Sequence, residues 1–440
     1  MAQTTTQAVK TSARWVLPLA WMAVLLDGFD LVIMGTVTPS LLAYKPWGLN
    51  AAGATWLVTV GLIGMTIGAL LIGYMTDLLG RRKLLIAAVT IFSLLTLACA
   101  FAPNPTMFAL IRFFAGLGLG GCLPTAIAMV NEFARSLGRS GRTTTVLMTG
   151  YHVGAVLTAV LALVFIKSGP DDWRILFVWG AVPALLLVPL MLWRLPESPS
   201  WLLTHDRRAE AEVIARANGI PVEDLAAAPD ISADAPEVSW RTLFEPHYLR
   251  RTLALAVTSF CGLILVYGLN NWLPTIMRDA GYELGAAFTF LLLLNVGAIA
   301  GLLIAGYVGD RLNTGIASVI WFYSAAVLLA LLSIKMQQAV LFVVVFIAGI
   351  FVFSGQVLVY AFTSENHPAK IRATALGFVA GIGRIGAITG PILGGWVVGA
   401  GMTQPWAFYG AALVGVVAAT ALLIGGIHKS EAHASVQAQG

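Results

Sequence analysis

The chain has 440 residues, of which 58% are hydrophobic and only 11% are charged, and its mean hydropathy is +0.85. Soluble domains carry about 25% charged residues, so this composition excludes an ordinary soluble protein and indicates an integral membrane protein. The formal net charge is +5, but the cations are spread over short loops without a basic stripe, which argues against a nucleic-acid partner.

Apolar windows long enough to cross a bilayer occur twelve times along the chain. They fall at about residues 15–43, 54–76, 84–103, 106–131, 143–168, 172–194, 251–277, 285–309, 315–334, 339–363, 372–400 and 404–427. The one long polar segment separates the first six windows from the last six, and its string HDRRAEAEVIARA predicts a helix on the membrane surface. We therefore expect a six-helix bundle over 1–194, a cytoplasmic linker over 195–250, and a second six-helix bundle with a tail over 251–440.

The distribution of Lys and Arg in the loops predicts the orientation in the membrane, and the cysteine pattern predicts whether disulfides or metals are present. Lys and Arg are more frequent in the tails and in the short loops on the same side, which places both termini and the linker in the cytoplasm. The first window is too long for a cleavable signal peptide and contains acids. Cys99, Cys122 and Cys261 lie in apolar runs without metal-ligand spacing, so we expect no disulfide, metal or other cofactor.

The first window is interrupted by two acids in the string LLDGFDLV. Asp27 lies about 18 Å along a helix that begins at Trp15, near the middle of a hydrocarbon core about 30 Å thick. Asp30 is three residues further and shares the same helix face. An ionised acid at this depth costs at least about 2.5–3.5 kcal/mol, so the pair should face a polar cavity or a cation, or hold protons.

Sequence similarity between the two halves points to an internal repeat. Gly73-Tyr74-x-x-Asp77 recurs as Gly306-Tyr307-x-x-Asp310, a displacement of 233 residues. The string DGFD aligns with the string YGLN that ends at Asn270, and the string HVGA that begins at His152 aligns with the string RIGA that begins at Arg384. We expect two homologous halves with a ligand site near the midplane at their interface.

Few other charged or ionisable side chains fall inside the windows: Arg112, Arg384 and His152. Arg384 lies about 18 Å beyond Arg372 at the cytoplasmic border, and its planar guanidinium suits a substrate carboxylate, although pairing with an acid of the protein itself is an open alternative. Arg112 is expected to pair with the acids of the first window, either until a proton or substrate displaces it or as a purely structural pair.

Two further groups complete the candidate site. Glu132 belongs at the cytoplasmic end of the fourth window and, with Asp77, Arg81 and Asp310, is expected to form an inner gate. Side chains in the seventh and tenth windows could line a pocket for a flat ring with polar substituents, although each is individually more typical of packing. They are Asn270, Asn271, Trp272, Gln356 and Tyr360.

The motifs resemble a known family along all twelve windows. GYMTDLLGRRK resembles the loop 2-3 motif of the major facilitator superfamily, with Leu78 where an Arg is common. DGFD, LNNWLPTIMRDAG and GIGRIGAITGP together resemble the aromatic acid:proton symporters. The resemblance implies uptake of benzoate, hydroxybenzoates or related acids across a bacterial inner membrane, with Asp27 and Asp30 coupling protons and Arg112 and Arg384 as intramembrane arginines.

The resulting hypothesis is a monomeric, proton-coupled importer of an aromatic carboxylate that works by alternating access in the lipid bilayer. A sugar or polyol symporter is the nearest alternative, favoured by the string PESPSWL but not by Arg384, and an exporter of organic acids or drugs is another. An enzyme is not expected, because the chain has neither a metal set such as HExxH nor a nucleophile-base motif. A receptor without transport, the identity of the acid and the number of protons stay open.

Overall fold

The computed structural model describes residues 13–135, 140–167, 169–218, 240–367 and 369–426. The chain clusters into two compact units, one of residues 1–49 and 56–234 and the other of residues 50–55 and 235–440. All regular elements in the described ranges are helical, which confirms the predicted all-α class. The residue bounds of the three expected segments stay a prediction.

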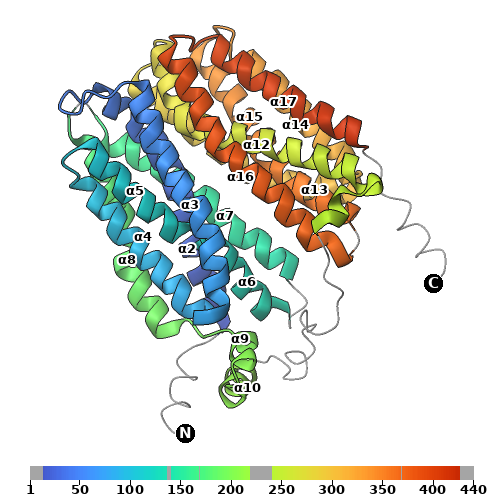
Figure 1. Ribbon diagram of the computed structural model, residues 1–440. Coiled ribbons are helices and arrows are strands. Elements are labelled where there is room, and N and C mark those ends of the chain that lie inside the picture. The colour runs from blue at the N-terminus through green and yellow to red at the C-terminus, as the bar shows by residue number, and fades with distance from the viewer. Residues whose placement is uncertain (1–12, 136–139, 168, 219–239, 368, 427–440) are drawn as a thin grey trace. The chain divides into compact units, whose positions relative to one another are not determined.

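The helices of the first half begin with the short 3-10 helix η1 and end with two short helices in the linker (Figure 1). They are η1 (Ala13–Trp15), α2 (Val16–Ala43), α3 (Ala51–Leu79), α4 (Arg81–Ala100), α5 (Pro105–Gly120), α6 (Cys122–Arg135), α7 (Ser140–Phe165), α8 (Asp172–Arg194), α9 (Pro199–Thr204) and α10 (Arg208–Ala217). Figure 1 shows α9 and α10 at one end of the first bundle.

The helices of the second half follow the same order of long elements. They are η2 (Trp240–Phe244), α12 (Pro246–Asp279), α13 (Leu284–Arg311), α14 (Thr314–Leu331), α15 (Gln338–Asn366), α16 (Ala369–Gly399) and α17 (Trp406–Gly425). Within the described ranges, twelve candidate spans are long and apolar enough to cross a membrane, so the chain is a multi-pass membrane protein.

Local chemistry sets several helix ends. Asn104 caps α5 by accepting a hydrogen bond from Met107 N at 2.8 Å, and Pro105 occupies the first turn. The expected fourth span is divided into α5 and α6 at Gly121, because Pro124 has no N–H to bond the carbonyl of Gly120. Both pieces still fall within one candidate span, Pro105–Phe133.

Helix packing repeats between the halves at the displacement of 233 residues that the sequence indicates. A methyl group built on Gly64 of α3 would lie 2.1 Å from the carbonyl oxygen of Phe113 of α5. A methyl group built on Gly297 of α13 would lie 2.0 Å from the carbonyl oxygen of Phe346 of α15. Gly297 and Phe346 lie 233 residues after Gly64 and Phe113. The α3–α5 and α13–α15 pairs therefore make the same close, glycine-dependent contact.

Candidate functional site

A buried ion pair inside the spans joins α2 and α5. Arg112 donates through both terminal nitrogens to the two carboxylate oxygens of Asp30, with Nη2 3.2 Å from Oδ2. Both residues are buried, Asp30 at 5% exposure and Arg112 at 3%. A charge buried in hydrocarbon without a partner is strongly unfavourable, so the pairing compensates the burial of both charges. The predicted pairing of Arg112 with an acid of the first span is present.

Asp27 and His152 are also buried in the first unit, each at 5% exposure. Asp27 lies one helical turn before Asp30 on α2, and His152 lies on α7, which packs closely against α2. The carbonyl oxygen of Tyr151 would lie 1.6 Å from a methyl group at Gly28, so the backbones of the two helices meet beside Asp27. Their predicted roles in coupling and binding stay predictions.

Arg384 lies on α16 of the second unit and is half-buried. Its Nη1 donates to the phenol oxygen of Tyr267 on α12 at 3.4 Å. The same two helices pack closely at Gly386, because a methyl group there would lie 2.2 Å from the carbonyl oxygen of Phe260. Sequence reasoning missed Tyr267 as a contact of Arg384, although it stands at the first position of the YGLN string.

Two amide side chains that the sequence singled out have side-chain partners in neighbouring helices. Asn270 Oδ1 accepts a hydrogen bond from Asn295 Nδ2 of α13 at 3.0 Å, and Gln356 Nε2 donates to Ser259 Oγ at 2.8 Å. All four residues are buried. Sequence reasoning missed Asn295 and Ser259, and the available signal for Asn295 was a lone amide within an otherwise apolar run.

The other pocket candidates donate hydrogen bonds to backbone carbonyls or pack beside the core. Asn271 Nδ2 donates to the carbonyl of Tyr267 on its own helix at 2.8 Å. Trp272 Nε1 donates to the carbonyl of Pro391 at 2.8 Å and is fully buried, and Tyr360 is half-buried beside the core around Phe322. These contacts are typical of packing roles, so substrate binding by these residues stays a prediction.

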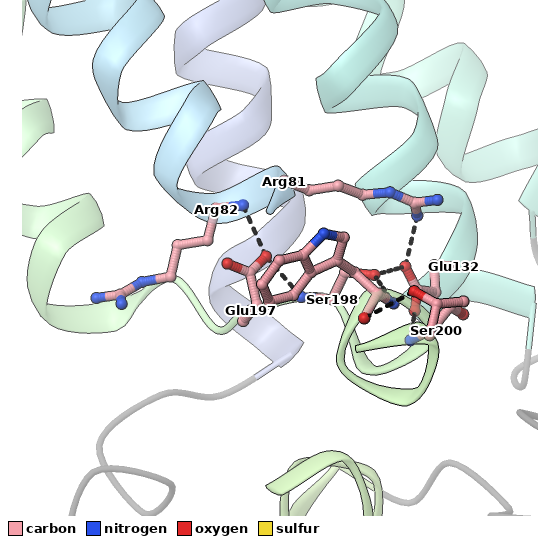
Figure 2. A network of polar contacts seen from close by, with 8 residues as sticks. Arg81, Arg82, Glu132, Glu197, Ser198 and Ser200 are labelled. Atoms are coloured by element: carbon pink, nitrogen blue, oxygen red, sulfur yellow. Dashed lines mark hydrogen bonds and ion pairs between the residues drawn. The ribbon is translucent and has the colours of Figure 1, made fainter. Parts of the chain in front are cut away.

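A polar network gathers at the end of the first bundle where α9 begins. Arg81 Nη1 lies 2.6 Å from Glu132 Oε2, and the same carboxylate accepts hydrogen bonds from Ser198 Oγ and Ser200 N, both at 2.6 Å. Figure 2 shows Arg81, Ser198 and Ser200 converging on Glu132. Glu197 Oε1 accepts from the backbone N of Arg82 at 2.8 Å.

The linker therefore contributes groups to the cluster around Arg81 and Glu132, and the role of this cluster as an inner gate stays a prediction. Sequence reasoning missed Glu197, Ser198 and Ser200, because it used the string PESPSWL only as an indication of a sugar or polyol symporter. A usable signal was the pair Ser198-Pro199, which is typical of a helix start and leaves backbone N–H groups for a carboxylate. The side chains of the other two gate candidates, Asp77 and Asp310, lie outside the described residues.

Metal and cofactor ligands do not gather in the part of the chain that the structure describes: no group of three or more His, Cys, Asp or Glu could hold a metal ion there. Cys99, Cys122 and Cys261 are buried thiols without a disulfide. Of the groups described above, an arginine such as Arg384 can bind an anion and a buried carboxylate such as Asp30 can accept and release a proton. The cluster around Glu132 can hold the start of α9 in place.

The family model of the Major Facilitator Superfamily matches residues 20–379. The chain belongs to this superfamily. The gallate transporter of Pseudomonas putida is 34% identical, over 96% of this chain and 94% of that protein. The benzoate transport protein of Acinetobacter baylyi is 32% identical, over 88% of this chain and 84% of that protein. Within the superfamily, the resemblance to the aromatic acid transporters is thereby confirmed.

Solved structures agree on the fold. The xylose transporter XylE from E. coli superposes with a TM-score of 0.74 and 19% identity, over 93% of this chain and 96% of that chain. This likeness shows the major facilitator fold and nothing about substrate. The relatives by sequence are named as transporters, which supports transport rather than catalysis.

Proposed function

We propose that this chain imports an aromatic carboxylate together with protons across the bacterial inner membrane, by alternating access, as a monomer with both termini in the cytoplasm. The observation that supports proton coupling is the buried ion pair of Asp30 and Arg112. When Asp30 takes a proton, Arg112 loses its counter-charge, so protonation and the arrangement of α2 and α5 are linked.

The substrate class rests on the relatives and on Arg384. The curated relatives are named for gallate, gentisate and benzoate, which are aromatic carboxylates. Arg384 is half-buried and donates to the phenol of Tyr267 at 3.4 Å, and its planar guanidinium is the group that grips a carboxylate through two hydrogen bonds. A sugar carries no negative charge for this arginine, so the sugar symporter is the weaker alternative.

Uptake into proteoliposomes tests the proposal. Labelled benzoate, gentisate or gallate should accumulate when an inward proton gradient is imposed, and a protonophore should abolish the accumulation, whereas labelled glucose should not accumulate. Asp30→Asn should lose accumulation, and Asp171→Asn, in an exposed outer loop, should keep it. Glucose accumulation, or acid uptake that survives the protonophore, would contradict the proposal.

A further inference from the structure

Gly61 of α3 lies directly against the guanidinium of Arg112. A methyl group built on Gly61 would lie 3.3 Å from Nη2, 3.5 Å from Nε and 3.6 Å from Cζ. All three atoms belong to the planar group whose terminal nitrogens hold Asp30. A contact of 3.3 Å is tighter than most contacts of real Cβ atoms, so with a methyl group at this position the guanidinium would have to shift by a few tenths of an ångström.

Close helix packing is the simpler explanation of a glycine at position 61, and the internal repeat provides a test of this explanation. A methyl group on Gly116 would lie 2.2 Å from the carbonyl oxygen of Gly61. In the second half, a methyl group on Gly349 would lie 2.0 Å from the carbonyl oxygen of Leu294. Gly349 and Leu294 are displaced by 233 from Gly116 and Gly61, so the same approach is made with leucine in place of Gly61.

The equivalent of Arg112 at this displacement is Val345, which is fully buried, and Leu294 is buried at 1% exposure. The second half therefore has leucine and valine where the first half has glycine and arginine. Since backbone packing alone is compatible with leucine, the glycine is explained by the volume of the guanidinium.

We propose that Gly61 is a positioning residue for the Arg112–Asp30 ion pair: the absent side chain leaves the space in which the guanidinium lies flat against α3 and reaches both carboxylate oxygens. A side chain at position 61 weakens this two-bond contact, and the carboxylate then accepts a proton more readily. The consequence for transport rests on the proposed proton coupling, whereas the spatial fit does not.

A pH profile tests the consequence for transport. In Gly61→Ala, the midpoint of the curve of gradient-driven uptake against pH should move in the alkaline direction by about half a pH unit or more. Gly118→Ala on α5 is the matched control, because its methyl group would lie at 3.2, 3.5 and 3.6 Å from atoms of Ile91, Phe92 and Ala88, none of them charged. An equal midpoint in Gly61→Ala and Gly118→Ala would overturn the proposal.

A double-mutant cycle tests the spatial fit without transport. Gly61→Leu should lower the melting temperature of the purified protein clearly in the wild-type background and much less in the Arg112→Val background, which recreates the pair of the second half. Equal losses in both backgrounds would show that Arg112 is not what the glycine accommodates. If the wild-type protein showed no proton-coupled uptake, the proposed function would be wrong. The spatial role of Gly61 would still be tested, because the double-mutant cycle measures melting temperatures and not transport.

Discussion

Arg112 and Arg384 differ in their contacts. Arg112 is buried and holds Asp30 through both terminal nitrogens, whereas Arg384 is half-buried and has a phenol contact with Tyr267. The first guanidinium is therefore committed to an acid of the protein. The second is more exposed than the first, and we propose it as the group that binds the substrate carboxylate.

Arg384→Lys should retain the positive charge and still lose most substrate binding, because an ammonium cannot reproduce the planar fork. We expect affinity to fall at least about tenfold, or about 1.4 kcal/mol, in equilibrium binding to purified protein, with Arg384→Gln weaker still. Affinity within about twofold of the wild type would mean that the carboxylate is not held in that fork.

At the scale of elements, the linker helix α9 and the end of α6 are joined through Glu132. Its carboxylate combines Arg81 with two groups at the start of α9, and its side chain is only 8% exposed. A partly buried carboxylate that accepts hydrogen bonds from three donors contributes more to the stability of the helix contact than an exposed ion pair does.

Arg81→Ala should slow turnover several-fold while changing substrate binding little, because the cluster lies at the end of the bundle and the Asp30 pair lies within the spans. The maximal rate and the half-saturating concentration of uptake give this comparison. Arg208→Ala is the control, since Arg208 pairs with Glu212 on the exposed side of α10 and should leave both values unchanged. A loss of binding as large as the loss of rate would place the cluster at the substrate site.

His367 directly follows α15, in the second half of the chain, and its protonation is expected to affect the stability of that half. Burial, assisted by the charge of Arg251, lowers the pKa of His367 from its usual 6.5, although the hydrogen bond to the Thr363 carbonyl opposes the shift. Its Nε2 lies 3.3 Å from Thr252 Oγ1, and its ring stacks on Tyr248.

The lowered pKa makes stability depend on pH. As pH falls through 6.5, the unfolded chain takes up a proton at His367 that the folded chain resists, so stability falls until the lower folded pKa is reached. The slope for this one group is at most about 1.4 kcal/mol per pH unit. Melting temperatures in detergent across this range should fall less in His367→Gln than in the wild type or in His205→Gln. Identical slopes in all three proteins would show that His367 does not carry the effect.

For the whole molecule, the number of working acids decides the energetics. A monoanion that moves with one proton carries no net charge, whereas with two protons one positive charge moves inward, and each 100 mV then contributes about 2.3 kcal/mol. Asp27 and Asp30 are both buried on α2, so this helix supplies two carboxylates that can each carry a proton.

Substrate should therefore induce an inward current in proteoliposomes if both acids titrate, and the current should vanish in Asp27→Asn and in Asp30→Asn. Asp27→Asn should also stop accumulation and retain some binding, because an amide mimics the protonated acid but cannot release a proton. Undiminished uphill uptake in Asp27→Asn would leave Asp30 or His152 as the carrier.

The sequence by itself determined the membrane class, the twelve spans and the internal repeat, because hydrocarbon demands long apolar helices whatever their neighbours are. It also placed Arg112 with the acids of the first span, since a buried charge needs a partner. The linker helix near residues 205–217 was likewise readable from its polar periodicity and is present as α10.

Only the tertiary structure decided which groups meet across helices. It selected Asp30 as the acid that Arg112 holds, joined Asn295 to Asn270, and brought Ser198 and Ser200 to Glu132. It also showed that Gly61 faces a guanidinium, while Gly64 faces a carbonyl. Contacts of this kind depend on the rotation and depth of each helix against its neighbours, and these are set by side-chain packing summed over the bundle, which hydropathy and spacing along the chain do not encode.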